Sequence, residues 1–426
     1  MRALVALTLL AFVASPGFAR SPLGESLNDI TVAPHWIYDD FPKAVAEAKS
    51  SGKPLLIVVR CVPCPPGRAL DEKVMQPDTE LAALEQKFVC VRLIQTNGLD
   101  LNVFQYDFDM SWAAMFLNAD MTVYGRYGSR NTGGKDSSDG LLSLPAFKKA
   151  AERALKLHAA YPTNKAELAA KTGAKPEYAT PTQIPGLTDR PASATERRQC
   201  IHCHMVKEYA LRAKWQEGRL STADLWVYPQ PANIGLTTDL DDGLRVTSVA
   251  AGSPAAAAGV APGDDLVSIN NQPLISLADI QWALHTAPVA GQLSVQLNRG
   301  GQTLSKTLAV RGDWKKSDLA WRASSWYGLR QGLKLEPLPA AERQSNKIAD
   351  DRLALVIKGL FGVGGNKLKE SGLKLNDIIV GIDGKTENLS DSDFLIYLRL
   401  AHGPKDSVKL ALLSGGARKE LTIPMW

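Results

Sequence analysis

The residues most able to do chemistry in this chain are Cys200 to His204, which read Cys-Ile-His-Cys-His. This C-x-x-C-H pattern is the attachment signal for a c-type haem, in which two thiols add to the vinyl groups and the histidine binds the iron. The alternative is a solvated cysteine pair or half of a zinc site. A zinc site of four ligands needs a second Cys or His pair, and no such pair is close in the sequence. We therefore expect covalent haem c at Cys200 and Cys203, with His204 as an axial ligand.

A second C-x-x-C pair, Cys61 and Cys64, follows the apolar run Pro54–Val59 directly. A C-x-x-C between a buried strand and a helix is the thioredoxin arrangement, in which the N-terminus of the helix stabilises the thiolate of the first cysteine. We expect Cys61 to be the attacking thiolate and Cys64 the resolving thiol. The alternative is an inert structural disulfide.

Two features near this pair depart from the thioredoxin pattern. Thioredoxins place a cis-proline opposite the disulfide, whereas Ser111-Trp112 stands at that point here, which weakens the expectation of general dithiol–substrate docking. Pro65 and Pro66 follow the second cysteine, so we expect the helix to start late and to leave the sulfurs more exposed. Cys90 lies on an apolar strand and is expected to be a packed free thiol.

The first residues have the pattern of a secretory signal peptide. Arg2 is followed by the mostly apolar run Ala3–Ala14 and by small residues before a cleavage point after Ala19. This run is too short to span a bilayer, and no later apolar run is long enough, so we expect no transmembrane segment. We expect an exported, periplasmic protein, in a compartment where disulfides and haem c can both form.

The composition sets limits on domain number and partners. The 426 residues predict about two to four domains. The net charge is +5 with both signs interspersed, which argues against nucleic acid as a partner. The five cysteines form two C-x-x-C pairs plus Cys90, which favours redox or cofactor chemistry over a disulfide framework.

The segment Gly252–Asp264 reads G-S-P-A-A-A-A-G-V-A-P-G-D and matches bacterial PDZ domains. In such domains a loop before the second strand offers backbone N–H groups to a peptide carboxylate, and the peptide joins the sheet edge. We assign this role to Ile234, Gly235 and Leu236, with Leu277–Leu284 as the helical wall of the groove. The alternative is a PDZ fold that serves only for packing or dimerisation.

A second PDZ-like copy follows, because the spacing from Gly372 to Asp377 repeats that from Gly259 to Asp264. Three tryptophans at 314, 321 and 326 lie between the copies and are expected to form a packing seam, with a wall over the haem as the alternative. The predicted fold class is multidomain α/β plus mainly β: a thioredoxin-like domain, a small helical haem c segment and two PDZ-like domains. The predicted boundaries are signal peptide 1–19, thioredoxin-like domain 28–160, linker 161–193, haem segment 194–226, first PDZ domain 228–312, Trp-rich linker 313–326 and second PDZ-like domain 327–426.

The whole order resembles a family of exported bacterial thioredoxin-like/PDZ domain-containing (seleno)proteins. The resemblance rests on Arg60–Cys64, Tyr124–Gly128, Cys200–His204, Tyr228-Pro229, Gly252–Ala255 and Trp321–Ser324. It implies that Cys61 stands where some members have selenocysteine, which favours a redox-active sulfur at that position.

These patterns together predict an exported thiol–disulfide and haem c redox protein that docks partners through its PDZ domains. The expected partners are protein C-termini or extended peptides at the first PDZ domain, and an electron-transfer or thiol partner. The alternative is a non-catalytic haem- or redox-sensing scaffold with a structural disulfide. A protease accessory or chaperone is a third hypothesis, but the chain has no G-x-S-x-G elbow and no trypsin-like Ser/His/Asp set, which argues against proteolysis.

Overall fold

The computed structural model describes residues 21–29, 33–130, 142–319 and 321–426. The predicted signal peptide, 1–19, lies outside these ranges. Within them, no helix is both long and apolar enough to cross a membrane.

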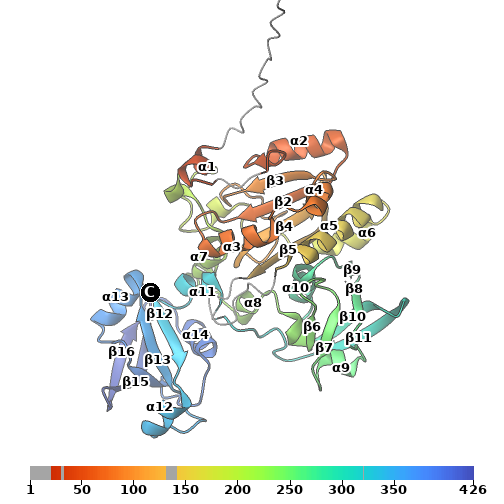
Figure 1. Cartoon of the computed structure of the whole chain (residues 1–426). Coiled ribbons are helices and arrows are strands. Elements are labelled where there is room, and N and C mark those ends of the chain that lie inside the picture. The colour runs from red at the N-terminus through yellow and green to blue at the C-terminus, as the bar shows by residue number, and fades with distance from the viewer. Residues whose placement is uncertain (1–20, 30–32, 131–141, 320) are drawn as a thin grey trace, which may run out of the picture.

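The N-terminal domain is a five-stranded sheet of order β1-β3-β2-β4-β5 covered by helices (Figure 1). Strand β2 is buried along its whole length, which explains the apolar run Leu55–Val59; the buried Arg60 at its end is paired with Asp29 at 2.7 Å. It pairs in parallel with β3 and antiparallel with β4. The elements are α1 (Pro22–Ser26), β1 (Ile37–Tyr38), α2 (Phe41–Ser51), β2 (Leu55–Arg60), α3 (Pro65–Val74), α4 (Thr79–Glu85), β3 (Val89–Leu93), β4 (Met110–Leu117), β5 (Val123–Arg130) and α5 (Leu144–Ala159).

Helix α3 begins at Pro65, immediately after its N-cap residue Cys64. The expectation of a late helix start was therefore wrong, because proline fits the first helical turn, where its missing N–H has no partner to lose. Cys61 is only 5% exposed, so the expected exposure of the sulfurs is wrong for that residue as well. Cys90 is buried in the core beside Leu56, as predicted for a packed thiol.

The middle of the chain wraps around the N-terminal domain as short helices and turns. They are α6 (Lys165–Leu168), η2 (Ala169–Lys171), η3 (Pro181–Gln183), η4 (Arg197–Gln199), α7 (Cys203–Gln216) and α8 (Thr222–Leu225). The stretch 161–193 was expected to be a linker, but it is packed: Lys171 is 1% exposed and its Nζ lies 2.7 Å from Asp279. The polar composition of this stretch did not indicate packing, because the buried charge of Lys171 is compensated by Asp279, which is distant in the sequence.

The third domain has two sheets, of order β11-β10-β8-β9 and β6-β7. The predicted elements are present, including the short Ala-rich helix α9 and the helix α10. Gly235 has φ of +86°, and a Cβ there would lie 2.1 Å from the Ser253 side chain, so glycine is required. The bounds are η5 (Pro231–Ile234), β6 (Leu236–Thr238), β7 (Val246–Val249), α9 (Pro254–Ala257), β8 (Asp265–Ile269), β9 (Gln272–Pro273), α10 (Leu277–Thr286), β10 (Gly291–Arg299) and β11 (Gln302–Val310).

The C-terminal domain repeats the order of short helix, turn and strand seen in the third domain. Its sheet has the order β12-β13-β14-β15-β16, and Trp215 of α7 adds to its core. The bounds are α11 (Ala323–Gly328), β12 (Leu333–Pro337), α12 (Ala340–Ser345), β13 (Leu355–Leu360), α13 (Gly362–Glu370), β14 (Ile378–Ile382), α14 (Asp391–Leu400), β15 (Ser407–Ser414) and β16 (Ala417–Pro424).

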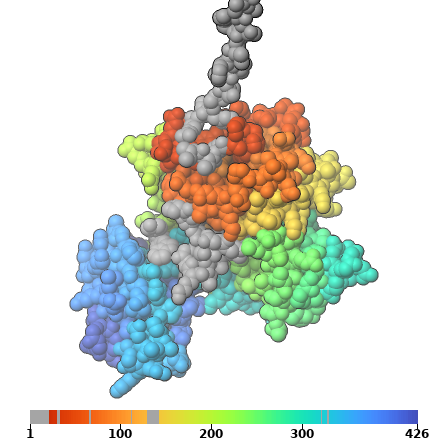
Figure 2. Space-filling view, viewed as in Figure 1, coloured from red at the N-terminus to blue at the C-terminus, as the bar shows by residue number. Residues whose placement is uncertain are grey.

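The two C-terminal lobes lie side by side beneath the N-terminal domain, the third in green and teal and the last in blue (Figures 1 and 2). Buried charges join the segment between these two lobes to the N-terminal domain. Arg322 lies 2.9 Å from Asp107 and 2.8 Å from Asp109. Trp321 is buried against Arg322, as expected for a packing seam, whereas Trp314 packs inside the core of the third domain rather than between domains. The side chain of Trp326 lies outside the described part of the chain.

Candidate functional site

Two cysteines and one histidine from distant segments meet where α7 packs against the N-terminal domain. Cys61 follows β2, Cys64 caps α3, and His202 caps α7. The Cys61 and Cys64 Sγ atoms are 2.6 Å apart. The Nδ1 atom of His202 lies 2.9 Å from Cys61 Sγ and 3.9 Å from Cys64 Sγ. Both helices therefore direct their N-termini at one small cluster of sulfur and nitrogen atoms.

Backbone hydrogen bonds fix the segment that carries His202. Thr96 donates from its N–H and its hydroxyl to the Ile201 carbonyl, at 3.3 and 2.8 Å. Asn97 accepts from the Ile201 N–H at 2.7 Å and donates to the Gln199 carbonyl at 2.9 Å. The loop after β3 thus holds the backbone of residues 199–201 on both sides, which positions the residue that carries the imidazole.

The charge of the dithiol is concentrated on Cys64. The hydrogen bond from the Cys61 thiol, helped by His202 and opposed by burial, lowers the pKa of Cys64 to about 5. The same hydrogen bond, together with burial, raises the pKa of Cys61 well above its ordinary value. Cys64 is also the more exposed sulfur and the cap of α3, where the helix dipole favours an anion.

This arrangement reverses the roles expected from the sequence, in which Cys61 was the thiolate. The reason is that Cys64 is itself the N-cap of α3, where the helix dipole favours an anion, whereas Cys61 precedes the first helical residue, Pro65, by four positions. The structure favours Cys64 as the thiolate and Cys61 as the protonated partner next to His202.

The two cysteines of the C-x-x-C-H motif, Cys200 and Cys203, lie beside the same cluster. Cys200 is buried among Leu23, Val62 and Ile94. Cys203 is buried against the N-terminal domain and receives the Tyr106 hydroxyl at 3.6 Å. Burial is the largest cause that raises the pKa of each thiol to about 12. Both cysteines line one closed space with Cys61 and His202.

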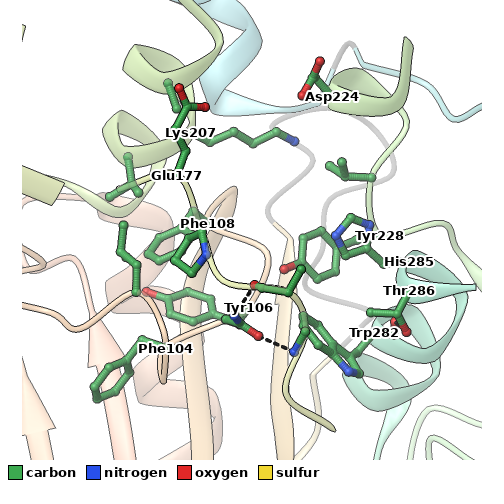
Figure 3. Close-up of a pocket in the computed structure, with 18 of the residues that line it drawn as sticks. Phe104, Tyr106, Phe108, Glu177, Lys207, Asp224, Tyr228, Trp282, His285 and Thr286 are labelled. Atoms are coloured by element: carbon green, nitrogen blue, oxygen red, sulfur yellow. Dashed lines mark hydrogen bonds between the residues drawn. The ribbon is translucent and has the colours of Figure 1, made fainter. Parts of the chain in front are cut away.

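The three motif residues expected to hold haem do not share a cavity in this arrangement: Cys200 lines a basin of about 620 Å³ that Cys203 and His204 do not line. A cavity beside α7, of about 850 Å³, is lined by Phe104, Tyr106 and Phe108 on one side and by Tyr228, Trp282 and His285 on the other (Figure 3). None of the predicted haem residues lines it.

The predicted iron ligand is engaged elsewhere: His204 Nδ1 lies 3.3 Å from Glu208. Burial lowers the pKa of His204, but the hydrogen bond and charge of Glu208 outweigh that effect and raise it. Haem c at Cys200 and Cys203 stays a sequence-based prediction, which haem staining of protein exported from a cytochrome c-maturing host would test.

The predicted peptide loop lies at the start of β6. Ile234 and Leu236 are buried in the core of the third domain, and the Gly235 N–H donates to the Ala232 carbonyl at 3.0 Å. One of the N–H groups expected to bind a carboxylate is therefore used internally. Helix α10, the expected groove wall, also packs on β5, where Trp282 stacks on Arg126 at 3.8 Å.

Sequence reasoning missed His202 as a functional residue. It is the middle residue of the C-x-x-C-H motif, and the haem interpretation gives the only histidine role to His204. The contact of His202 with Cys61 joins residues 141 positions apart, and no local pattern signals such a contact.

Comparisons with known proteins identify two domains. Residues 36–119 match the thioredoxin-like family and residues 233–310 match the PDZ domain family. The chain thus contains a thioredoxin-like domain and a PDZ domain. No curated protein matches it.

Solved structures resemble only parts of the chain. A serine endoprotease from Yersinia pestis is 28% identical over 18% of this chain and 28% of that chain, with a TM-score of 0.17. The HtrA3 PDZ domain bound to a phage-derived ligand is 27% identical over 19% of this chain and 74% of that chain, with a TM-score of 0.15. The HtrA-type protease AlgW with a decapeptide is 18% identical over 31% of this chain and 40% of that chain, with a TM-score of 0.21. This chain thus spans 28% of the length of the Yersinia protein.

Proposed function

We propose that this protein is an exported thiol–disulfide exchange protein whose PDZ domain holds partner polypeptides close to the dithiol. The observation that carries the proposal is the convergence of Cys61, Cys64 and His202 at two helix N-termini. A lowered thiol pKa beside an imidazole is the arrangement that makes a cysteine nucleophilic near neutral pH.

The exchange begins at Cys64. Its thiolate attacks one sulfur of a partner disulfide, forms a mixed disulfide and releases the other partner sulfur as a thiolate. Cys61 then gives its proton to His202, whose Nδ1 lies 2.9 Å away, and attacks the Cys64 sulfur. The Cys61–Cys64 disulfide forms and the second partner thiolate leaves, so two electrons pass from the dithiol to the partner. The reverse sequence oxidises a partner dithiol.

The PDZ domain supplies proximity in this proposal. Strand β6 pairs with β7 on one edge, and a peptide added at its other edge would be held by main-chain hydrogen bonds. Linking a docking site to a reactive site raises the effective concentration of the partner, without any new contact at the sulfurs. The C-terminal domain, with its repeated element order, is proposed as a second PDZ-like module.

The test of exchange is reduction of glutathione disulfide by the full chain, with dithiothreitol as the final reductant. We expect catalysed reduction by the wild type, and loss of the catalysed rate in Cys64→Ser. Cys90→Ser is the matched control, since Cys90 is buried at a distance from the dithiol, and it should keep the rate. Equal rates in wild type and Cys64→Ser would refute the proposal.

The second candidate is a redox-sensing scaffold in which the pair forms a structural disulfide. It is favoured by the burial of Cys61 and by Trp112, which replaces the thioredoxin cis-proline and is fixed by a hydrogen bond from its Nε1 to Asp71 at 2.9 Å. If the protein is such a scaffold, it should catalyse no exchange and form no trapped mixed disulfide. Glutathione disulfide should then be reduced equally slowly by the wild type and by every cysteine variant.

A further inference from the structure

We propose that the reduced dithiol and His202 form a three-ligand site for Cu(I). Within the described ranges, Cys61, Cys64 and His202 are the one group of three potential metal donors whose ligand atoms all lie within 4.8 Å of one another. The three donors come from two segments that the fold holds together, and the Thr96 and Asn97 hydrogen bonds fix the histidine. The inference requires only reduced thiols and so does not rest on catalysed exchange.

The donor set favours a soft ion. Thiolate and thioether ligands select Cu(I) and Zn²⁺ over hard cations such as Mg²⁺ and Ca²⁺, which take oxygen ligands. Two sulfurs and one imidazole nitrogen suit three-coordinate Cu(I), whereas structural zinc sites are closed by four ligands. This set includes no carboxylate.

The surroundings add further soft donors. A basin beside the site, of about 620 Å³, is lined by Cys200, His202 and Met205. Its thiol and thioether lie in the same basin as His202, one of the three proposed ligands. Arg190, Arg197 and Arg198 line this basin together with one acidic residue, Glu196, which pairs with Arg198 at 2.9 Å, so its net positive charge disfavours a free hydrated cation and favours delivery from an anionic Cu(I)–thiolate complex.

The geometry needs a small adjustment to receive the ion. With metal–sulfur bonds of about 2.3 Å and metal–nitrogen bonds of about 2.0 Å, trigonal ligand atoms lie roughly 3.7 to 4.0 Å apart. The Cys64–His202 separation of 3.9 Å already meets this value. The sulfur–sulfur separation of 2.6 Å must open by about 1.4 Å and the Cys61–His202 separation of 2.9 Å by about 0.8 Å, which a rotation of the sulfur-bearing side chains supplies.

Binding is a ligand exchange without electron transfer. Cu(I) arrives as a thiolate complex, the Cys61 proton leaves to solvent or to the departing thiolate, and both protein sulfurs coordinate as thiolates. Oxidation to the Cys61–Cys64 disulfide removes two of the three ligands, so the metal site exists only in the reduced protein.

The experiment is an anaerobic titration of the reduced full chain with Cu(I) in competition with the chromophoric chelator bicinchoninate. We expect one Cu(I) per chain, with two sulfur ligands and one nitrogen ligand in the X-ray absorption spectrum. Cys61→Ser, Cys64→Ser and His202→Ala should each weaken binding by at least the 10- to 100-fold that loss of an outer-shell partner costs. Circular dichroism of each variant checks that it is folded.

Matched controls separate this site from its neighbours. His204→Ala and Cys90→Ser should bind Cu(I) as the wild type does. Equal weakening by His204→Ala and His202→Ala, equal binding by the disulfide form, or tighter binding of Zn²⁺ through four sulfurs including Cys200 and Cys203 would overturn the proposal. Glutathione disulfide reduction by the same preparations without copper reports exchange separately, so failure of one activity is distinguishable from failure of the other.

Discussion

Replacing His202 with alanine should raise the pH at which Cys64 becomes nucleophilic. The hydrogen bond from Cys61 is the largest cause of the lowered pKa of Cys64, which is about 5, and His202 is the next cause that favours the thiolate. A favourable neighbouring charge or donor at this range is worth about 1 to 3 pKa units. The variant should therefore show a midpoint of reactivity about 1 to 3 units above that of the wild type.

The size of the effect can be worked out at pH 6. With a pKa of about 5, roughly 90% of Cys64 is thiolate at that pH, whereas a rise of two units leaves roughly 9%. Because the thiolate is the reacting form, alkylation relative to its own high-pH plateau should be about tenfold slower in His202→Ala. Reactivity increases as pH rises through the midpoint, so the variant curve lies to the alkaline side.

The assay is pulsed alkylation with iodoacetamide between pH 4 and 9, followed by mass analysis of the peptide that contains Cys64. Cys200 and Cys203 should react slowly in both proteins, because burial raises their pKa values to about 12. His35→Ala is the control, since that imidazole is paired with Glu85 elsewhere on the domain. Identical profiles for wild type and His202→Ala, or a wild-type midpoint near 8.5, the ordinary thiol value, would refute the reasoning.

Three further predictions concern the dithiol, the seam and the PDZ domain. A rise of two units in the pKa of Cys64 in His202→Ala should lower the reduction potential of the Cys61–Cys64 pair at pH 7 by about 50 mV, measured against glutathione, because the reduced form loses thiolate stabilisation. An unchanged potential would contradict this prediction. Arg322→Ala should lower the free energy of unfolding by about 3 to 5 kcal/mol in urea, because Asp107 stays buried without its ion-pair partner and Asp109 keeps only Lys207, at 3.1 Å, as an ion-pair partner; a change below about 1 kcal/mol would show that the pairs contribute little. Apolar C-terminal peptides should bind the full chain at micromolar Kd, about −8 kcal/mol, as free acids and more weakly as amides; equal binding of the two forms would refute carboxylate capture by the loop at 234–236.

The elements that the sequence predicts well are those set by local patterns. The apolar run before Cys61 forms β2. Asp40 and Gly52 cap the two ends of α2, and the helix expected at Leu277–Leu284 is α10. In each case a cap, a turn or an unbroken apolar run lies within the element itself. Family matching at 36–119 and 233–310 agrees with these assignments.

The elements that the sequence did not predict depend on contacts between distant residues. The stretch 161–193 has the composition of a linker, yet Lys171 is buried because Asp279 neutralises it. The structure favours Cys64 over Cys61 as the thiolate because Cys64 is the N-cap of α3, and the C-x-x-C pattern alone does not fix where a helix that begins with Pro65 starts. The partnership of His202 with Cys61 requires the packing of α7 on the N-terminal domain, which a motif of five residues cannot report.

The most direct test of the central claim is to trap the exchange intermediate in Cys61→Ser. Without the resolving thiol, the mixed disulfide formed when Cys64 attacks a disulfide partner such as glutathione disulfide should accumulate, and peptide mass mapping should place it on Cys64. A mixed disulfide on Cys200 or Cys203 instead, or none in Cys61→Ser while Cys64→Ser accumulates one on Cys61, would contradict the account.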